Sequence, residues 1–440
     1  MTRTKTRRTM KPQMTKYKLG DIAEMVISSI DKKTKEGEKK VRLCNFVDVY
    51  HNWAITSDMH DNLMVASASD NNIEKLSLKR GCVALTKDSE TRDDIGIPTY
   101  IADDFDDVVL GYHCALVKPD ESKLSGKYLN AFMNSSYIKK YFEMNATGSG
   151  MRYTLAADTL QNMPILLPSL EEQERIGNIF SMIDRKIALN RALNHNLEAM
   201  AKQLYDYWFV QFDFPNAEGK PYKSSGGKMV CNERLRRELP EGWEVCELSS
   251  VGEIKSGFPF KSEDYISNGE FGIITIKNVQ DHHLDLSSFE TIKEKPQRLP
   301  SYCELQEGDC LISLTGNVGR VCRVTTNNLL LNQRVGKVEA KGCSPQWVYQ
   351  LYDDPAIAKQ IQMLANGCAQ ANVSPIDIGH ILVPMASTDI LQKFEEKVNV
   401  IYQEYLANEK QIIGLSKLRD ELLPLLMNGQ VSVNYDLSAD

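Results

Sequence analysis

Two long stretches of the chain carry apolar residues mostly three or four positions apart, which is the spacing of one face of an α-helix. The first stretch follows Pro168, and Ser169 is a suitable N-cap in front of an acidic first turn. The polar Asn190 interrupts its apolar stripe. We therefore expect a long coiled-coil helix over residues 169–212. The stripe consists of Phe180, Ile183, Ile187, Leu193, Leu197, Met200, Leu204 and Tyr207.

A second stretch of the same design closes the chain. After Pro384, either Ser387 or Thr388 can cap a helix that we expect over residues 385–428, with a C-terminal tail over residues 429–440. Its apolar positions step by three and four, break and then resume. The pattern predicts a twofold repeat of a globular block followed by a long helix. The second stripe consists of Leu391, Phe394, Val398, Ile401, Tyr405, Ile412, Leu415, Leu418, Leu422 and Leu425.

The two globular blocks share an order of short strands and helices. We expect the first block over residues 17–168 and the second over residues 241–384. The order is shared while the detail differs, which is typical of two binding modules of one design with different targets. The expected segments are 79–86 (turn and strand), 108–117 (one or two strands), 128–142 (helical spacing), 147–153 (Gly-rich loop) and 165–168 (strand), then 307–314 (strand), 345–364 (one helix), 366–372 (loop) and 381–384 (strand).

The remaining segments differ from the blocks in composition. Residues 213–240 are rich in Pro, Gly, Ser and Lys, which indicates a linker. Residues 1–18 carry seven basic and no acidic residues. We expect residues 1–16 to be a basic flexible arm, for which a DNA-seeking role is an alternative. Either Met1 or Met14 is the natural start.

Composition narrows the class of protein. A hydrophobic content of 42% and a charged content of 25% are ordinary for a soluble protein, and no apolar run reaches the roughly 18 residues that span a bilayer. The ten cysteines include no C-x-x-C pair, which favours free thiols in a reducing cytoplasm over structural zinc. The net charge of −7 includes the seven positive charges of residues 1–18, so the body without this segment is near −14 and any contact with nucleic acid must come from local basic patches.

Sequence motifs for catalysis are mostly missing. No Asn-Pro-Pro-Tyr or Asp-Pro-Pro-Tyr methylation motif, no G-x-G-x-x-G after a strand and no G-x-x-x-x-G-K-[ST] phosphate loop occurs. Nuclease-like Glu-x-Lys triplets at 121–123 and 253–255 are expected by chance in a chain this charged. The pair His282–His283 favours a solvated loop over a metal site. We therefore expect a non-catalytic chain without catalytic or metal-binding residues.

Four motifs flank the helices and carry a resemblance to a known family. They are Pro-Ser-Leu-Glu-Glu-Gln-Glu-Arg-Ile at 168–176, the aromatic run at 208–215 leading to Lys-Pro-Tyr-Lys-Ser-Ser-Gly-Gly at 220–227, Leu-Pro-Glu-Gly-Trp at 239–243, and Leu-Arg-Asp-Glu-Leu-Leu-Pro-Leu-Leu-Met-Asn-Gly at 418–429. Together they resemble the specificity (S) subunit of type I restriction–modification systems, from about Tyr17 onward. The start of the second helix departs from the family pattern, with Met-Ala-Ser-Thr-Asp at 385–389 where a Pro-Leu-x-Glu-Gln run is usual.

The resemblance implies an α+β fold with two globular α/β target-recognition domains in pseudo-two-fold repeat, separated by two long antiparallel coiled-coil helices. Each domain would read one half of a bipartite, asymmetric site in double-stranded DNA. The chain would recruit adenine methyltransferase (M) subunits, in two copies, and restriction/translocase (R) subunits would join them. The chain would bind no cofactor itself, while S-adenosylmethionine, ATP and Mg would be held by the partner subunits.

The helices support a spacing role independently of the resemblance. A helix of about 37 residues is roughly 55 Å long, which exceeds the roughly 34–36 Å repeat of B-DNA. Modules at its opposite ends would contact half-sites separated by untouched base pairs. The alternatives are a non-catalytic coiled-coil scaffold whose blocks bind protein, and a related defence system that reuses the same architecture.

Candidate DNA-binding residues lie in short turns and loops, because Arg and Lys bind phosphates while Arg, Lys, Asn and Gln also read base edges. The strand–turn–strand segment at 314–323 should present Asn317, Arg320 and Arg323 at a tip. Lys255 and Lys261 are lesser candidates. The full set is Lys87, Arg92, Ser149, Arg152 and Tyr153 in the first block, and Thr315, Asn317, Arg320, Arg323, Asn332, Gln333, Arg334, Gln370 and Asn372 in the second.

Overall fold

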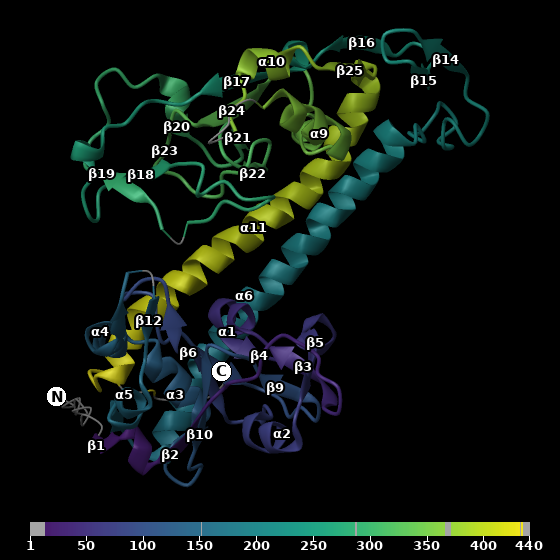
Figure 1. Ribbon diagram of the computed structural model, residues 1–440. Coiled ribbons are helices and arrows are strands. Elements are labelled where there is room, and N and C mark those ends of the chain that lie inside the picture. The colour runs from purple at the N-terminus through teal and green to yellow at the C-terminus, as the bar shows by residue number, and fades with distance from the viewer. Residues whose placement is uncertain (1–13, 151, 287, 366–370, 432, 434–440) are drawn as a thin grey trace, which may run out of the picture. The chain divides into compact units, whose positions relative to one another are not determined.

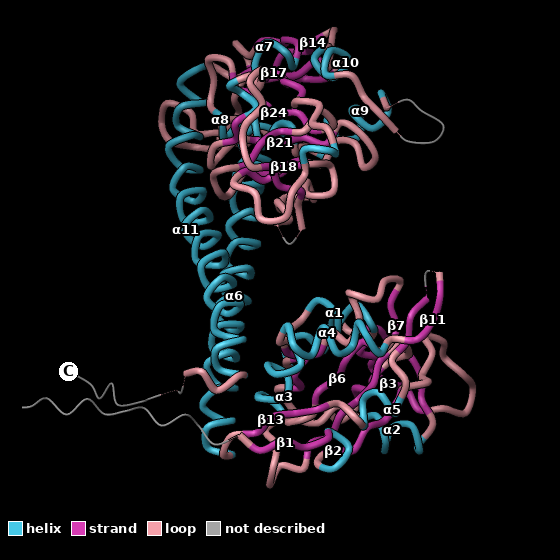
Figure 2. The backbone as a smooth tube through the Cα atoms, turned by 90° about the vertical axis from the view of Figure 1, so that its left-hand side faces the viewer, coloured by secondary structure: helices cyan, strands magenta, loops and turns pink. Residues whose placement is uncertain are grey.

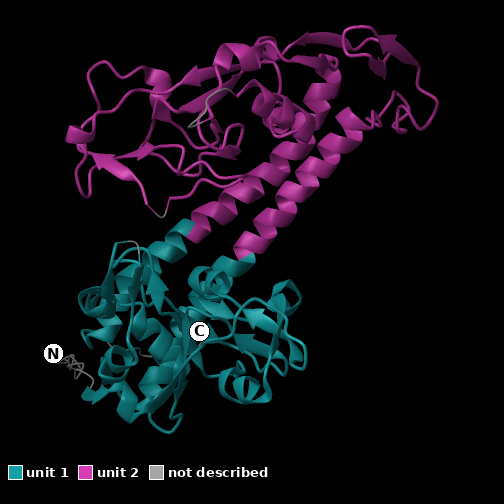
Figure 3. Cartoon of the chain, in the orientation of Figure 1, with its two compact units in different colours: residues 1–189, 413–440 teal, residues 190–412 magenta. Residues whose placement is uncertain are grey.

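The computed structural model describes residues 14–150, 152–286, 288–365, 371–431 and 433. The chain divides into two compact units, which are coloured separately in Figure 3. Unit 1 contains residues 1–189 and 413–440, and unit 2 contains residues 190–412. Each unit holds one globular block and one part of each long helix, α6 (Leu170–Tyr205) and α11 (Thr388–Met427) (Figure 1).

Both predicted long helices are present. Ser169 Oγ accepts a hydrogen bond from the backbone N–H of Glu172 at 3.3 Å, which caps a free donor of the first turn of α6. A π-helical turn, η3 (Asp206–Val210), follows α6, and its Trp208 and Phe209 are buried. At the start of α11, the N–H of Leu391 donates to the carbonyl of Ser387.

The two long helices lie side by side and antiparallel (Figure 2). In unit 2, Asn190 Nδ2 donates to Gln411 Oε1 at 3.2 Å, and Asn194 Nδ2 donates to Glu409 Oε1 at 2.7 Å. Asn408 Nδ2 donates in turn to Asn194 Oδ1 at 3.0 Å. The predicted break in the apolar stripe is therefore a layer of buried polar side chains, which fixes the register of the helix pair.

The block of unit 1 is built on a five-stranded sheet in the order β2-β10-β6-β8-β4. A second sheet has the order β5-β3-β9, a small third sheet has the order β11-β12-β7, and β1 pairs with β13. The strands are β1 (Thr15–Lys18), β2 (Ala23–Ile27), β3 (Lys39–Cys44), β4 (Ala54–Ile55), β5 (Met64–Ala68), β6 (Val83–Thr86), β7 (Asp88–Ser89), β8 (Pro98–Ile101), β9 (Val108–Leu110), β10 (Cys114–Pro119), β11 (Thr147–Ser149), β12 (Arg152–Thr154) and β13 (Pro164–Leu167).

The helices of this block cover the main sheet and join it to the long helices. Their bounds are η1 (Leu19–Asp21), α1 (Phe46–His51), η2 (Ser57–Asn62), α2 (Asp70–Leu76), α3 (Gly126–Met133), α4 (Ser136–Asn145) and α5 (Ala157–Gln161). Tyr128 and Phe132 of α3 share one apolar core with Phe180 of α6 and Leu423 and Leu426 of α11. Burial of apolar surface therefore attaches the block to the helix pair in unit 1.

The block of unit 2 has a sheet in the order β17-β24-β21-β22 and a second in the order β19-β18-β23-β20. β16 pairs with β25, and β14 pairs with β15. The elements are β14 (Met229–Asn232), β15 (Arg237–Pro240), β16 (Glu244–Glu247), α7 (Leu248–Val251), β17 (Gly252–Ser256), η4 (Ser262–Asp264), β18 (Phe271–Ile274), β19 (Glu290–Ile292), η5 (Ser301–Cys303), β20 (Glu304–Leu305), β21 (Cys310–Ser313), β22 (Val321–Arg323), β23 (Leu329–Leu331), β24 (Val335–Ala340), α8 (Pro345–Tyr352), α9 (Pro355–Leu364), α10 (Pro375–Gly379) and β25 (Leu382–Met385).

The two blocks repeat one topology. The strands β2-β10-β6-β8 have the same order and antiparallel pairing as β17-β24-β21-β22. The parallel pair β3–β9 corresponds to β18–β23, and the pair β1–β13 corresponds to β16–β25. Gly96 and Gly319 occupy the same place before β8 and β22, and both have positive φ (77° and 88°). The predicted pseudo-two-fold repeat is confirmed.

Some expected elements differ from the structure. The single helix predicted over 345–364 is wrong, because the segment forms two helices, α8 and α9. Asp354 caps α9 by accepting from the N–H of Ala356, and Pro355 disfavours a helical conformation at the residue before it. The Gly-rich segment 147–153 includes the paired strands β11 and β12, and the expected linker 213–240 includes the hairpin β14–β15.

No helix in the described ranges has both the length and the apolar character needed to cross a membrane.

Candidate nucleic-acid interface

Surface 1 is the part of unit 1 formed by residues 87–92, 147–150 and 152–154. Strand β7 pairs with β12, which pairs with β11, so two segments far apart in the sequence share one small sheet. Arg92 is exposed, and its guanidinium carbon lies 5.2 Å from the centre of the Tyr153 ring. Ser149 and Arg152 are exposed and face each other in the β11–β12 register. The structure therefore brings the predicted candidates of the first block together.

Lys87 belongs to a network of charged side chains within surface 1, and its side chain is largely covered. Its Nζ lies 2.7 Å from Asp88 Oδ1, and His113 Nδ1 lies 2.6 Å from Asp88 Oδ2. Burial disfavours the ionised form of Asp88, but hydrogen bonds from Lys87, Thr154 and His113 outweigh it and lower the pKa of this carboxyl. Lys87 is thus held in a largely covered ion pair, which the sequence did not predict.

Surface 2 is the corresponding part of unit 2 and is formed by residues 314–320, 332–334 and 371–372. The N–H of Gly316 donates to the carbonyl of Ala371 at 2.8 Å, and the N–H of Leu314 donates to the carbonyl of Arg334 at 3.1 Å. Thr315 Oγ1 lies 2.9 Å from Asn372 Oδ1. Three segments that the sequence nominated separately are therefore neighbours.

The candidates of surface 2 differ in how far their side chains reach solvent. Asn317, Gln333, Arg334 and Asn372 are exposed. Thr315 and Asn332 are 9% exposed, and Asn332 Oδ1 accepts from the N–H of Arg334, so these two residues shape the turns. Gln370 lies outside the described residues.

Arg320 lies on the wall of a hollow of about 450 Å³, which residues 316–320 of surface 2 help to line. Its Nη1 donates to Gln280 Oε1, and its Nε lies 3.4 Å from Asp281 Oδ2. These contacts hold the guanidinium in place while 29% of the side chain stays exposed. The sequence did not indicate Gln280 and Asp281, because they belong to a segment far from the turn in the chain.

A comparison with models of known protein families identifies the family to which the two repeated halves belong. The family model described as "Type I restriction modification DNA specificity domain" matches residues 12–199 and 240–412. The chain belongs to this specificity-domain family. The two matched segments include both blocks and most of both long helices.

Relatives in the specificity-domain family match over large parts of their length. The type I restriction enzyme HindI specificity subunit of Haemophilus influenzae is 23% identical, and the match covers 94% of this chain and 99% of that protein. The MjaIX specificity subunit of Methanocaldococcus jannaschii is 26% identical over 70% of this chain and 69% of that protein. The crystal structure of an S subunit from M. genitalium has 14% identity and a TM-score of 0.54, covering 96% of this chain and 98% of that one. It supports the same fold.

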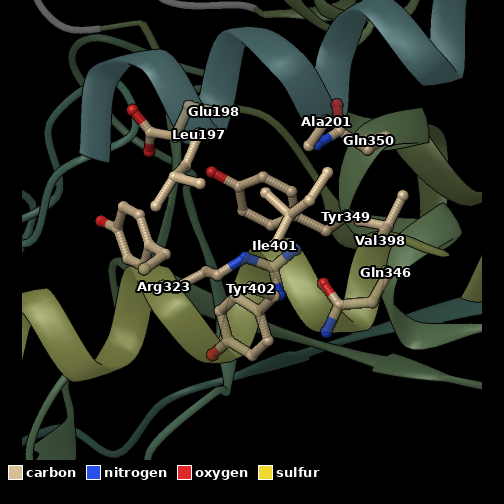
Figure 4. Close-up of a pocket in the computed structure, with 11 residues that line it drawn as sticks. Leu197, Glu198, Ala201, Arg323, Gln346, Tyr349, Gln350, Val398, Ile401 and Tyr402 are labelled. Atoms are coloured by element: carbon tan, nitrogen blue, oxygen red, sulfur yellow. The ribbon is translucent and has the colours of Figure 1, made fainter. Parts of the chain in front are cut away.

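One residue of this specificity-domain protein is not where the sequence placed it. Arg323 was expected at the tip of the turn, but it is 8% exposed. Its guanidinium carbon lies 3.7 Å from the ring centre of Tyr349 on α8 and 4.2 Å from that of Tyr402 on α11 (Figure 4). The reason is register: Arg323 pairs with Cys310 in β21–β22, well below the turn. Arg323 joins the block to the helix pair in unit 2.

The carboxyl group of Glu198, on α6, lies close to the Arg323 contact. Glu198 and Arg323 line a small cavity of about 30 Å³ together with Tyr349 and Tyr402 (Figure 4), and Tyr405 also belongs to its lining. Burial, together with the negative charges of Asp353 and Glu409, raises the pKa of Glu198 to about 8, and Arg323 opposes this shift. The Tyr402 hydroxyl also has no hydrogen-bond partner among the described residues.

The remaining polar candidates are engaged in local contacts. Lys255 forms an ion pair with Glu339 at 2.5 Å, and Lys261 forms one with Glu263 at 3.2 Å. His282 Nδ1 lies 3.6 Å from Asp353 Oδ2. In the part of the chain that the structure describes, no group of three or more His, Cys, Asp or Glu side chains is placed to hold a metal ion.

Proposed function

We propose that this chain is the DNA sequence-specificity subunit of a type I restriction–modification complex, in which each block reads one half of a bipartite, asymmetric site. The observation that carries the proposal is one strand topology built twice with different polar residues at the same place. Surface 1 presents Arg92 and Arg152, whereas surface 2 presents Asn317, Gln333 and Arg334. A scaffold with one function would have no need of two chemically different surfaces on one framework.

The exposed residues have the chemistry that base recognition needs. Arg can form two hydrogen bonds with guanine, and Asn or Gln can form two with adenine, in the major groove. Arg320 is preoriented by Gln280 and Asp281, which reduces the loss of side-chain entropy when it binds a base. Lys87 shares Asp88 with His113, so it supplies charge for a phosphate only when that ion pair opens.

We propose that the two long helices set the distance between the half-sites. α6 has 36 residues and α11 has 40 residues, and each is continuous from one unit to the other. At about 1.5 Å per residue, they are roughly 54 and 60 Å long. The buried polar layer at Asn190, Asn194 and Asn408 supports this function, because two helices that set a fixed distance must pair in a single register.

The helices also offer a surface for partner subunits. In unit 2, Leu193 and Met200 of α6 are 48% and 53% exposed. A hollow of about 600 Å³ is lined by the apolar or aromatic side chains of Met200, Leu204, Tyr207 and Ile401 and by the polar side chains of Gln203, Asp206 and Gln211. In unit 1, Met182 and Leu189 of α6 are 58% and 52% exposed. Exposed apolar patches of this kind mark protein interfaces. We propose that they receive methyltransferase subunits in two copies, which restriction subunits then join.

In this proposal, the chain has no catalytic centre and binds no cofactor of its own. The methyltransferase subunits would bind S-adenosylmethionine, and the restriction subunits would use ATP and Mg in the cytoplasm. The chain would contribute recognition and spacing alone.

Methylome sequencing of a methylation-deficient host tests the proposal. The host would express the methyltransferase encoded beside this chain, either alone or together with the chain. We expect a split motif with modified adenines on both strands that occurs only when the chain is present. Co-purification of the two proteins without any motif would instead favour a scaffold that binds protein.

A further inference from the structure

A three-residue turn joins the two main sheets of each block. In unit 1, residues 111–113 connect β9 to β10, and in unit 2, residues 332–334 connect β23 to β24. The second turn contains Gln333 and Arg334, which the sequence nominated as DNA-binding residues. The first turn has the sequence Gly-Tyr-His, and no motif in the sequence drew attention to it.

Backbone hydrogen bonds show that the two turns are equivalent. Each turn begins with an N–H that donates to the strand parallel to the one before the turn. It continues with an N–H that donates to the connection before that parallel strand. It ends with a carbonyl that accepts from the first residue after β6 in unit 1 or after β21 in unit 2. The paired bonds are Gly111 N to Cys44 O and Asn332 N to Ile274 O (2.8 and 3.1 Å), Tyr112 N to Ile30 O and Gln333 N to Phe258 O (2.9 and 3.0 Å), and Lys87 N to His113 O and Leu314 N to Arg334 O (2.9 and 3.1 Å).

The side chains of the first turn are presented rather than buried. Tyr112 is 43% exposed, and the ring centres of Tyr112 and His113 are 3.9 Å apart. His113 has a φ of 70°, in the left-handed region where His, Asn and Asp are enriched among non-glycine residues. This unusual conformation sits beside surface 1, as the bond from Lys87 shows.

Asp88 holds His113 in one orientation. The Oδ2 atom of Asp88 lies 2.6 Å from Nδ1 of His113. An ionised carboxylate can only accept hydrogen bonds, so Nδ1 carries the proton and the other ring nitrogen, Nε2, is left for another partner. Asp88 itself is only 13% exposed, which places it beneath the turn rather than at the surface.

We infer that Tyr112 and His113 read base edges in the half-site bound by unit 1, as the counterparts of Gln333 and Arg334 in unit 2. The inference rests on the proposed function and adds to it two specificity-determining residues. The Tyr112 hydroxyl and His113 Nε2 are the hydrogen-bonding groups that meet the bases. Asp88 is a positioning residue that acts through His113.

The test uses variants that keep the fold of the turn. His113→Asn preserves a residue type that tolerates positive φ, and Tyr112→Phe removes only the hydroxyl. Tyr17→Phe is the matched control, because Tyr17 is an exposed tyrosine on β1 of the same unit. Gln333→Ala is the reciprocal variant in unit 2. Each full-length variant is purified with its methyltransferase subunit and titrated with duplexes that carry single base-pair changes across the wild-type site.

We expect the His113→Asn complex to lose about tenfold of its discrimination at one position of one half-site, while the other half-site is read as before. Gln333→Ala should change only the other half-site, and Tyr17→Phe should change neither. Asp88→Asn should weaken discrimination at the same position as His113→Asn, without further loss in the double variant.

Two outcomes would overturn the inference. One is an unchanged binding profile for His113→Asn and Tyr112→Phe. The other is a uniform loss of affinity for all duplexes with unchanged ratios, which a purely structural turn would produce. Failure of the proposed function is a different result, because the wild-type complex itself would then show no sequence preference.

Discussion

The two blocks differ where their frameworks are most alike. At corresponding places after β6 and β21, Asp88 in unit 1 pairs with Thr154 of β12, and Thr315 in unit 2 forms an isolated β-bridge with Asn372. Asp88 forms ion pairs with Lys87 and His113, whereas Thr315 makes a neutral contact with Asn372. The backbone hydrogen bonds are common to both blocks, while the charge they present is not. A framework that needs no particular side chains at this surface leaves the surface free to vary with its target.

The blocks also differ in how they are attached to the helices. In both units an apolar core joins the block to the long helices, with Phe180 and Leu426 in unit 1 and Tyr205 and Phe394 in unit 2. Unit 2 adds a polar attachment to this core, in which the buried guanidinium of Arg323 stacks between two tyrosines with Glu198 nearby. By strand register, the residue of unit 1 that corresponds to Arg323 is Tyr100. The apolar cores are insensitive to pH, whereas the partly buried carboxyl of Glu198 is not, so the stability of the two units should respond differently to pH.

The largest expected effect comes from lengthening both long helices, which would increase the distance between the two blocks. Insertion of seven residues after Leu189 and of seven after Ile412 would lengthen both helices by about 10.5 Å. The two insertion points flank the same polar layer, because Asn190 bonds with Gln411. We expect the spacer in the methylation motif to grow by up to about three base pairs, with both half-sites unchanged.

A control separates length from damage to the helix pair. An insertion in α6 alone would shift Asn190 and Asn194 away from Gln411 and Glu409 and leave buried polar groups without partners. We expect that variant to be less stable than the doubly lengthened chain in urea unfolding. A stable double insertion with an unaltered spacer would refute the ruler.

Removal of the polar attachment should affect unit 2 alone. Arg323→Ala deletes two cation–π contacts and the positive charge next to Glu198, and we expect a loss of about 2–4 kcal/mol in the free energy of unfolding. Tryptophan fluorescence can follow this, since Trp208, Trp243 and Trp347 lie in unit 2 and Trp53 in unit 1. The methylation motif at a permissive temperature should be unchanged. A changed motif with normal stability would return Arg323 to the recognition surface.

Arg320 should behave in the opposite way. We expect Arg320→Ala to cost about 1–3 kcal/mol of discrimination at one half-site and to change stability little, because the side chain is partly exposed. Gln280→Ala is the matched control, since it removes a hydrogen bond to the guanidinium and leaves Arg320 in place. It should give a smaller effect at the same base pair. Identical binding profiles for wild type and Arg320→Ala would remove Arg320 from the set of base-reading residues.

The contrast between Arg320 and Arg323 shows what the sequence could predict. Apolar spacing predicts the long helices, and Ser169 predicts the start of the first, because these features depend on neighbours in the chain. The segments that form surface 1 and surface 2 are brought together by pairing between strands far apart in the sequence. The sequence could therefore nominate each turn without showing that the turns are neighbours in space. Both arginines follow Gly319 within a few residues, and only the register of β22 decides which one is buried.

Tyr112 and His113 illustrate a second limit. Their turn corresponds to residues 332–334 in backbone hydrogen bonds and shares none of their residue types. A search for basic or amide side chains therefore finds one turn and misses the other. The internal repeat was the signal that could have linked them, once the strands before and after each turn had been aligned.

The smallest expected effect concerns the carboxyl in the polar attachment. Burial raises the pKa of Glu198 to about 8 in the folded chain, compared with an ordinary value of 4.5. Between these two pH values the folded state holds a proton that the unfolded state has lost, so the free energy of unfolding falls as pH rises through this window. Above about pH 8 the full penalty of a buried charge is present. A glutamine, which resembles the protonated carboxyl in shape and charge, never incurs that penalty.

We therefore expect Glu198→Gln to unfold like the wild type near pH 5 and to be more stable at pH 9, by on the order of 1–2 kcal/mol because solvent still screens part of the charge. Urea unfolding followed by tryptophan fluorescence at pH 5, 7 and 9 measures the difference, and Glu404→Gln on the exposed face of α11 is the control. A stability gain that is the same at all three pH values would mean that Glu198 does not change its protonation on folding. In that case the attachment of unit 2 would be as insensitive to pH as the apolar attachment of unit 1, and the second difference between the blocks would be one of packing alone.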